Sequence, residues 1–147
     1  MFKNIVVATD GSKHSENAAS IGLEIAKLTS GKVTTLYIAD SGRYIVPVDV
    51  SYNIADDVIK SVKRSVLDEG EAALRRVEEK ALEAGVPVES KLVEGNPADD
   101  IIKTAGELGA DLIVMGSIGK TGIEKFLLGS VAEKVVRNSK IPVLVVR

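Results

Sequence analysis

The sequence contains no cysteine, and only one of its 147 residues is a histidine. The absence of thiols excludes disulfides, thiolate metal sites and a cysteine nucleophile, and one histidine excludes a metal site built from several imidazoles. Aromatic residues make up 3% of the chain, so a core has to be built from Val, Ile, Leu and Ala. No apolar run approaches the roughly 20 residues that a membrane-spanning helix needs. The run from Ile5 to Ala8 is also too short for the apolar part of a signal peptide. We therefore expect a cytoplasmic protein without a membrane partner.

The sequence also lacks a large excess of basic over acidic residues, or of acidic over basic ones. The 19 basic and 21 acidic residues leave a formal net charge of -2. Nothing in this balance supplies the basic face that nucleic-acid phosphates require, so we expect no nucleic-acid partner. With 45% hydrophobic and 27% charged residues, the composition is that of a globular chain. The length suits one domain, which we place at residues 1–147.

Five short apolar runs alternate with segments of helical periodicity. The runs cover residues 4–9, 33–39, 88–93, 112–116 and 142–146, and the helical segments cover 13–29, 55–84, 97–108 and 130–138. Three of the runs are apolar on both faces, as strands of a covered parallel sheet are. The alternation predicts right-handed crossovers and the α/β fold class. The expected architecture is a single doubly wound, five-stranded parallel sheet in the order 3-2-1-4-5, with helices on both faces.

Polar residues mark where three of these helices begin. Ser12 is the predicted N-cap of the first helix, and Asn96 caps the helix that opens with Pro97. Ser130 and Glu133 have the spacing of a capping box at the start of the last helix.

Two further features of the sequence concern the core and the surface. The predicted core stripe of the first helix comprises Ala18, Ile21, Ile25 and Leu28. The irregular insert at 41–53, after the second strand, has the composition of a mobile flap rather than a linker.

The order of the strands also predicts where a ligand binds. Open parallel sheets bind ligands at the carboxyl ends of their strands, at the point where the strand order reverses. In the expected order this point lies between the first and fourth strands. The loops that leave these two strands are Asp10-Gly11-Ser12 and the segment 116–129, which are rich in glycine and small polar residues.

The segment 116–122 carries the strongest chemical signal, because three of its seven residues are glycines. Glycines allow backbone N–H groups to approach a phosphate without interference from a Cβ. Gly129 and Ser130 then open a helix, whose unpaired N–H groups form a second anion site. Gly119-Lys120-Thr121 imitates the end of a P-loop, but position 114, where a P-loop has a glycine, is a valine.

The pattern Gly116-x2-Gly119-x9-Gly129-Ser130 resembles the ATP-binding signature of the universal stress protein family. The resemblance extends over essentially the whole chain, from the opening strand with its Asp-Gly-Ser loop to the closing strand. It implies a Rossmann-like, three-layer α/β/α fold of the adenine nucleotide alpha hydrolase-like kind. It also implies an ATP-binding regulatory or stress-response module. One departure is Ile118, where many members carry a polar or basic residue.

The resemblance further implies a set of ligand contacts. Asp10 would contact the ribose or the metal side of ATP, Ile38 would offer backbone groups to the adenine, and Met115 would pack near the sugar. Cofactor-binding residues are thereby expected at Ala8, Thr9, Asp10, Ile38, Met115, Gly116, Gly119, Gly129, Ser130 and Val131. The expected cofactor is ATP with Mg²⁺. No dedicated metal ligand is expected, with Asp10 as a candidate Mg²⁺ contact through ATP.

Several alternatives stay open at this point. Asp10 suits a plain Asp-Gly-Ser turn as well as a ligand contact, and the Ser130 hydroxyl serves either its helix or a phosphate. Lys120 and Lys125 have the composition of solvated loop charges. The function alternatives are a slow ATPase or phosphotransferase that uses the same site, and a family member that binds AMP or another small ligand. Binding is favoured because the loop offers no evident catalytic base, so no catalytic residue is assigned.

The last strand predicts a homodimer. From Ile141 to Val146 it carries no charge, and in the expected order it lies at an edge of the sheet. A bare apolar edge pairs readily with another chain. Antiparallel pairing with its own copy closes this edge, and the family resemblance implies the same dimer. The alternative is a monomer in which the 41–53 flap or a neighbouring helix covers the strand.

Overall fold

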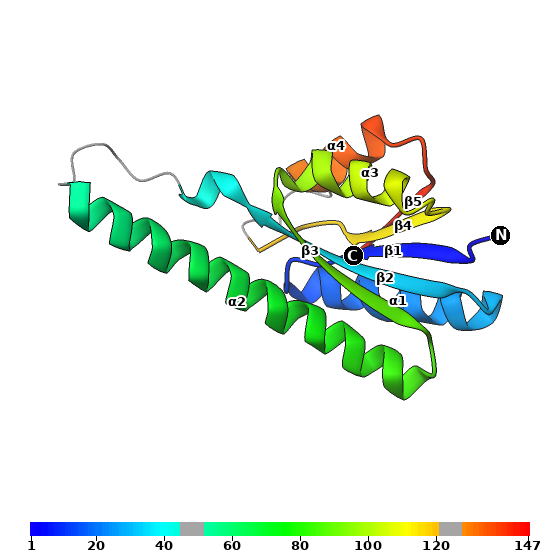
Figure 1. Cartoon of the computed structure of the whole chain (residues 1–147). Coiled ribbons are helices and arrows are strands. Elements are labelled where there is room, and N and C mark those ends of the chain that lie inside the picture. The colour runs from blue at the N-terminus through cyan, green and yellow to red at the C-terminus, as the bar shows by residue number, and fades with distance from the viewer. Residues whose placement is uncertain (45–51, 121–127) are drawn as a thin grey trace.

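The computed structural model describes residues 1–44, 52–120 and 128–147, in which five parallel strands form one sheet in the order β3-β2-β1-β4-β5 (Figure 1). The strands are β1 (Asn4–Ala8), β2 (Lys32–Asp40), β3 (Val88–Gly95), β4 (Leu112–Gly116) and β5 (Val143–Val146). The helices are α1 (Lys13–Thr29), α2 (Tyr52–Ala84), α3 (Pro97–Glu107) and α4 (Ser130–Asn138), and a short 3-10 helix covers Ser41–Tyr44. The predicted fold class and strand order are confirmed.

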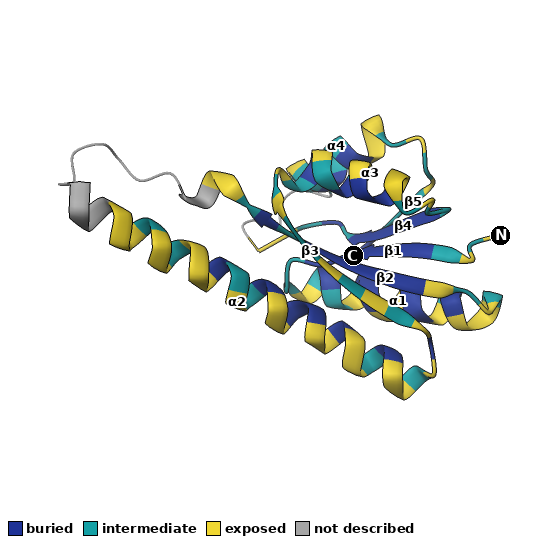
Figure 2. Cartoon of the chain, viewed as in Figure 1, coloured by how far each residue is buried: buried dark blue, intermediate teal, exposed yellow. Residues whose placement is uncertain are grey.

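The helices cover both faces of the sheet, with α1 and α2 on one side and α3 and α4 on the other (Figure 1). Figure 2 shows that β1 and β4, in the middle of the sheet, are almost wholly buried, whereas β3 at one edge alternates between partly buried and exposed residues. Ile5, Val6 and Val7 have no exposed surface. The runs that are apolar on both faces therefore form the middle of the sheet, where helices pack against both faces.

The core face of α1 differs from the predicted stripe. Ala18 is buried, but Ile21 is 37% exposed and Leu28 is 86% exposed. The buried face instead consists mainly of small residues: Ser15, Ala18, Ala19, Gly22, Leu23 and Ala26. A Cβ on Gly22 would lie 2.6 Å from Cγ2 of Val7 in β1. The helix lies so close to the sheet that this face accommodates mainly small side chains, and the larger apolar residues are displaced to its flank.

The other sequence signals concern α2 and the insert. The helix α2 is continuous from Tyr52 to Ala84 and contains Gly70. A Cβ at Gly70 would lie 2.6 Å from the Tyr37 ring of β2, so the glycine allows this close approach. Of the insert predicted at 41–53, the 3-10 helix and the start of α2 are described, and residues 45–51 lie outside the described part. No described helix is both long and apolar enough to cross a membrane.

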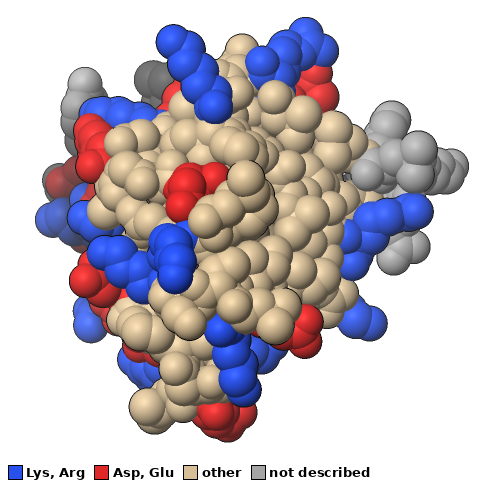
Figure 3. Space-filling view, turned by 90° about the vertical axis from the view of Figure 1, so that its right-hand side faces the viewer, with Lys and Arg blue, Asp and Glu red and all other residues tan. Residues whose placement is uncertain are grey.

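Charged side chains of both signs lie on the face of the molecule that Figure 3 shows. Figure 3 views the molecule from the side on which the N-terminus lies in Figure 1, and shows acidic and basic residues interspersed around a broad uncharged area. This distribution is consistent with the near balance of charges in the sequence.

Candidate functional site

A cavity of about 330 Å³ opens at the carboxyl ends of the strands, next to the loops that leave β1 and β4. All ten cofactor-binding residues expected from the sequence line this cavity: Ala8, Thr9, Asp10, Ile38, Met115, Gly116, Gly119, Gly129, Ser130 and Val131. The topological argument and the glycine pattern therefore lead to the same place. Their roles as ligand contacts stay predictions.

One wall of the cavity is apolar. It is formed by side chains of β2, β4, α3 and α4: Leu36, Ile38, Met115, Pro97, Ile101, Val131 and Ala132. Sequence reasoning missed Pro97 and Ile101, which come from α3. A signal for them existed, because Asn96 and Pro97 follow directly after β3 and so lie at the same edge of the sheet as the predicted loops. This wall suits the face of a planar, weakly polar group.

The backbone at the start of α4 also lines the cavity. The predicted capping box is wrong, because the N-cap is Gly129 and Ser130 is already the first helical residue. The Gly129 carbonyl accepts the N–H of Glu133, and no side chain caps the helix. The first-turn N–H groups of α4 are thus without a capping side chain. They are donors of the kind that bind an anion at a helix N-terminus.

The three glycines of the motif are each close to other atoms of the chain. A Cβ at Gly116 would lie 2.9 Å from the Ser15 nitrogen, and one at Gly129 would lie 3.1 Å from the Ser117 carbonyl oxygen. A Cβ at Gly119 would lie 2.5 Å from an Asp10 carboxylate oxygen. The glycines therefore allow the two loops and α1 to pack together, in addition to any role toward a ligand.

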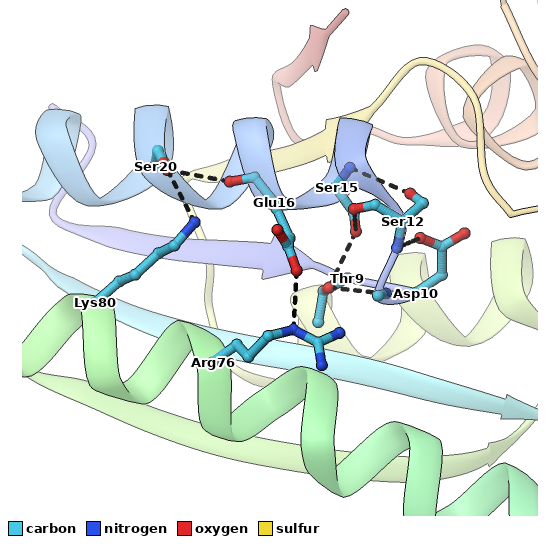
Figure 4. Close-up of polar contacts among 9 residues, drawn as sticks. Thr9, Asp10, Ser12, Ser15, Glu16, Ser20, Arg76 and Lys80 are labelled. Atoms are coloured by element: carbon cyan, nitrogen blue, oxygen red, sulfur yellow. Dashed lines mark hydrogen bonds and ion pairs between the residues drawn. The ribbon is translucent and has the colours of Figure 1, made fainter.

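Asp10 is held by hydrogen bonds from both loops. Its carboxylate accepts the backbone N–H of Ser12 and the backbone N–H of Lys120, each at 2.9 Å (Figure 4 shows the Ser12 contact). Burial raises the pKa of the Asp10 carboxyl, but hydrogen bonds from Ser12 and Lys120 outweigh this effect and leave its pKa below the ordinary value of 3.8. Asp10 is therefore ionised at neutral pH.

The lowered pKa predicts an acid-dependent loss of stability. Because the folded-state pKa lies below the unfolded value, the carboxylate stabilises the fold fully above about pH 4, and this contribution is lost as the pH falls through the folded pKa. We expect Asp10→Asn to lower the free energy of unfolding by about 1 kcal/mol at pH 7. Urea unfolding of both proteins at pH 7, 4 and 3 measures the difference. It should shrink toward acid pH, and a constant difference would contradict the assignment.

Two buried hydroxyl groups support the turn that carries Asp10 (Figure 4). Thr9 and Ser15 are 6% and 4% exposed, and their hydroxyl oxygens lie 3.1 Å apart. The Ser12 hydroxyl accepts the N–H of Ser15, which confirms Ser12 as the N-cap of α1. Ser15 was not predicted to belong to the site, because nothing in a helical serine marks it as the partner of Thr9.

Basic side chains near the site are paired with acidic ones. The Lys120 ammonium lies 3.2 Å from Glu69 of α2, and the Arg76 guanidinium lies 2.8 Å from Glu16 of α1 (Figure 4). The other charged residues of the segment 116–129, Glu124 and Lys125, lie outside the described residues, as do Thr121 and Gly122. Among the described residues, no three His, Asp or Glu side chains are grouped so that they could hold a metal ion.

The fold and the cavity define the class of protein. The chain is a doubly wound, Rossmann-like α/β protein. It has a cavity of ligand size at its topological switch point, lined by an apolar wall and by the uncapped N-terminus of α4, which is where proteins of this class bind ligands. The comparison with known proteins is more specific. The profile of the Universal stress protein family matches residues 1–147, and the chain belongs to this family.

Two relatives illustrate the extent of the match. Universal stress protein MJ0531 of Methanocaldococcus jannaschii is 40% identical over 148 residues, which span 100% of this chain and 83% of the relative. Universal stress protein YxiE of Bacillus subtilis is 36% identical over 151 residues, which span 100% of both chains. The likeness therefore includes both loops of the candidate site.

Solved structures extend the comparison to the fold. The structure of hypothetical protein MJ0577 is 30% identical, with a TM-score of 0.83 over 99% of this chain and 96% of that one. A universal stress protein in complex with cAMP is 30% identical, with a TM-score of 0.70 over 99% and 97%. The universal stress protein from Archaeoglobus fulgidus in complex with dAMP is 26% identical, with a TM-score of 0.64 over 100% of both chains. Nucleotides thus bind to proteins of this fold and family.

Proposed function

We propose that this protein binds ATP in the cavity at the carboxyl ends of the strands and acts as a nucleotide-dependent regulatory or stress-response module. The observation that carries the proposal is the pairing of an apolar wall, which suits an adenine ring, with the uncapped N-terminus of α4, which suits phosphates. The structures of relatives with cAMP and dAMP support an adenine nucleotide as the ligand class. The ten cavity residues named above are the proposed contacts, and the cytoplasmic compartment stays a prediction from the sequence.

The proposed ATP binds together with Mg²⁺. Each carboxylate oxygen of Asp10 already accepts a backbone N–H, and this leaves few lone pairs free. Asp10 could therefore supply only a small part of the ligands of a bound cation. Mg²⁺ usually keeps several waters and binds substrate phosphates with one or two carboxylates, and a single carboxylate fits this pattern. The phosphates would therefore supply the main ligands, and Mg²⁺ would offset their negative charge next to Asp10.

Binding without rapid turnover is the favoured mode. Hydrolysis needs a group that positions water and cations that offset the developing charge. The described part of the loop after β4 offers Lys120, whose ammonium is paired with Glu69. The loop after β1 offers Asp10, whose low pKa makes it a weak base. A slow ATPase is the second candidate function, and a ligand such as AMP or a cyclic nucleotide is the alternative within the same class.

Calorimetry and a phosphate-release assay test the proposal. We expect ATP with Mg²⁺ to bind, and turnover to fall well below the roughly 1–1,000 per second of ordinary enzymes. Titrations with ADP, AMP and cAMP identify the preferred nucleotide, and native mass spectrometry of the purified protein shows which one it retains. Turnover in the ordinary enzyme range would refute the binding module, and no heat with any adenine nucleotide would refute the nucleotide site.

We also propose a homodimer that forms through β5. This strand is at the edge of the sheet, where its residues Val143, Leu144 and Val145 are only half-buried. Val136 of α4, the helix that packs on β5, is 48% exposed. A partly exposed apolar strand at a sheet edge is a surface that a second copy can cover.

A further inference from the structure

The carboxylate of Asp10 connects two loops that are far apart in the sequence. One oxygen accepts the Ser12 N–H within the loop after β1, and the other accepts the Lys120 N–H from the loop after β4, each at 2.9 Å. The second contact spans 110 positions of the chain. Hydrogen bonds to an ionised carboxylate are stronger than neutral ones, so Asp10 fixes the position of the Lys120 backbone relative to β1.

Gly119 leaves the space that this contact requires. A Cβ at this position would lie 2.5 Å from the Asp10 oxygen that accepts the Lys120 N–H. Among the described glycines, those with a left-handed backbone are Gly11, Gly85 and Gly109, so the backbone conformation of Gly119 does not itself require a glycine. The residue is therefore constrained by the carboxylate next to it.

The turn that carries Asp10 is itself held by a directed chain of hydrogen bonds. The Thr9 hydroxyl accepts the Gly11 N–H at 3.2 Å and lies 3.1 Å from the Ser15 hydroxyl, which in turn donates to the Ser12 carbonyl at 2.8 Å. Since the single proton of Ser15 goes to Ser12, Thr9 donates its own proton to Ser15. Both hydroxyl groups of this buried chain have hydrogen-bond partners. The turn is therefore rigid, and it orients the Asp10 carboxylate toward the loop after β4.

We propose that Asp10 is a positioning residue, which holds the start of the loop after β4 against β1, and that Gly119 is a glycine because of this carboxylate rather than because of the ligand. The proposal rests on the proposed nucleotide site for its effect on affinity. In addition to its proposed contact with the nucleotide, Asp10 acts on the ligand through the Lys120 backbone, because it sets the shape of the cavity before the ligand binds. A preset loop loses less conformational entropy when the ligand binds.

A double-mutant cycle separates the carboxylate from the ligand. We expect Gly119→Ala to weaken ATP binding at least about fivefold in the wild-type background, because the new methyl group displaces Asp10. In the Asp10→Ala background the same substitution should change affinity less than about twofold, since the space is then free. Gly106→Ala is the matched control, because a Cβ at this α3 position meets no atom within 4 Å. An equal loss in both backgrounds, or no loss in the wild type, would overturn the proposal.

Amide hydrogen exchange in the ligand-free protein tests the contact independently of nucleotide binding. We expect Asp10→Ala to speed exchange of the Lys120 N–H at least about tenfold. The N–H of fully buried Val114 in β4 reports on the fold and should keep its rate. Unchanged exchange at Lys120 would overturn the proposal even if ATP binds.

If no adenine nucleotide binds, the proposed function fails and this measurement alone decides on the Asp10 contact. If Gly119→Ala does not fold, refolding in the Asp10→Ala background supports the proposal and failure in both backgrounds refutes it.

Discussion

Replacing Gly129 by valine is expected to reduce ATP affinity by roughly 10- to 150-fold while leaving the fold intact. This range corresponds to the loss of one charge-assisted hydrogen bond of about 1.5–3 kcal/mol. Gly129 is the N-cap of α4, and its Cβ position lies 3.1 Å from the Ser117 carbonyl oxygen and 3.5 Å from Cα of Ile118. A branched side chain there pushes the loop away from the helix N-terminus and fills the approach to its N–H groups. The backbone has φ of -74°, which valine adopts without strain.

Calorimetry with ATP and Mg²⁺ measures the loss, and circular dichroism checks the fold. Ser130→Ala is the informative companion. Because Ser130 is not the cap of α4, its loss should change the free energy of unfolding by no more than about 0.5 kcal/mol. It should still weaken binding if its hydroxyl contacts a phosphate. A Gly129→Val variant that folds and binds ATP with full affinity would show that the phosphates do not lie at the start of α4.

The sequence contained enough information for the sheet and for the location of the site. Apolar runs and helical periodicity set the order of elements, and the order alone placed the loops after β1 and β4 at one edge. The choice of core residues within α1 could not be predicted in the same way. Ile21 and Leu28 are more apolar than Gly22 and Ala26, but the helix presents its small residues to the sheet because they allow the closest packing. This preference depends on the distance between the helix and the sheet. The periodicity of the helix sequence carries no information about that distance.

In the site, too, the sequence predicted the location but not the contacts of individual residues. The glycine spacing identified the loop, but the pattern alone suggests that every glycine serves the ligand. In the structure, Gly116 accommodates α1 and Gly119 accommodates Asp10, which are contacts between segments about 100 residues apart. Likewise, Ser130 and Glu133 have the spacing of a capping box, but the helix begins at Ser130, so its N-cap is Gly129. A shift of one residue at a helix start reverses the role of a side chain, and local sequence rarely resolves it.

The second prediction with a large effect concerns the proposed dimer. The carbonyls of Pro142 and Val146 accept N–H groups of Ile113 and Ser117, so these residues and Leu144 between them direct their backbone groups toward β4. Val143 and Val145 consequently direct theirs toward the free edge. A proline at 145 removes an outward donor, which an edge strand tolerates, whereas Leu144→Pro removes a donor from the β4–β5 pairing and disturbs the fold itself. Val145→Pro is therefore the sharper variant.

We expect the wild type to elute with the mass of two 15.5-kDa chains in light scattering after size exclusion at micromolar concentration. Val145→Pro should elute as a monomer with an unchanged circular dichroism spectrum, because antiparallel pairing across a two-fold axis loses the same bond twice. Val136→Ser is a milder companion: it reduces the apolar surface of α4 next to the strand and should raise the dissociation constant without removing a backbone donor. A monomeric wild type would refute the dimer. A Val145→Pro variant that folds and remains fully dimeric would show that the interface lies elsewhere on the molecule and not at the β5 edge of the sheet.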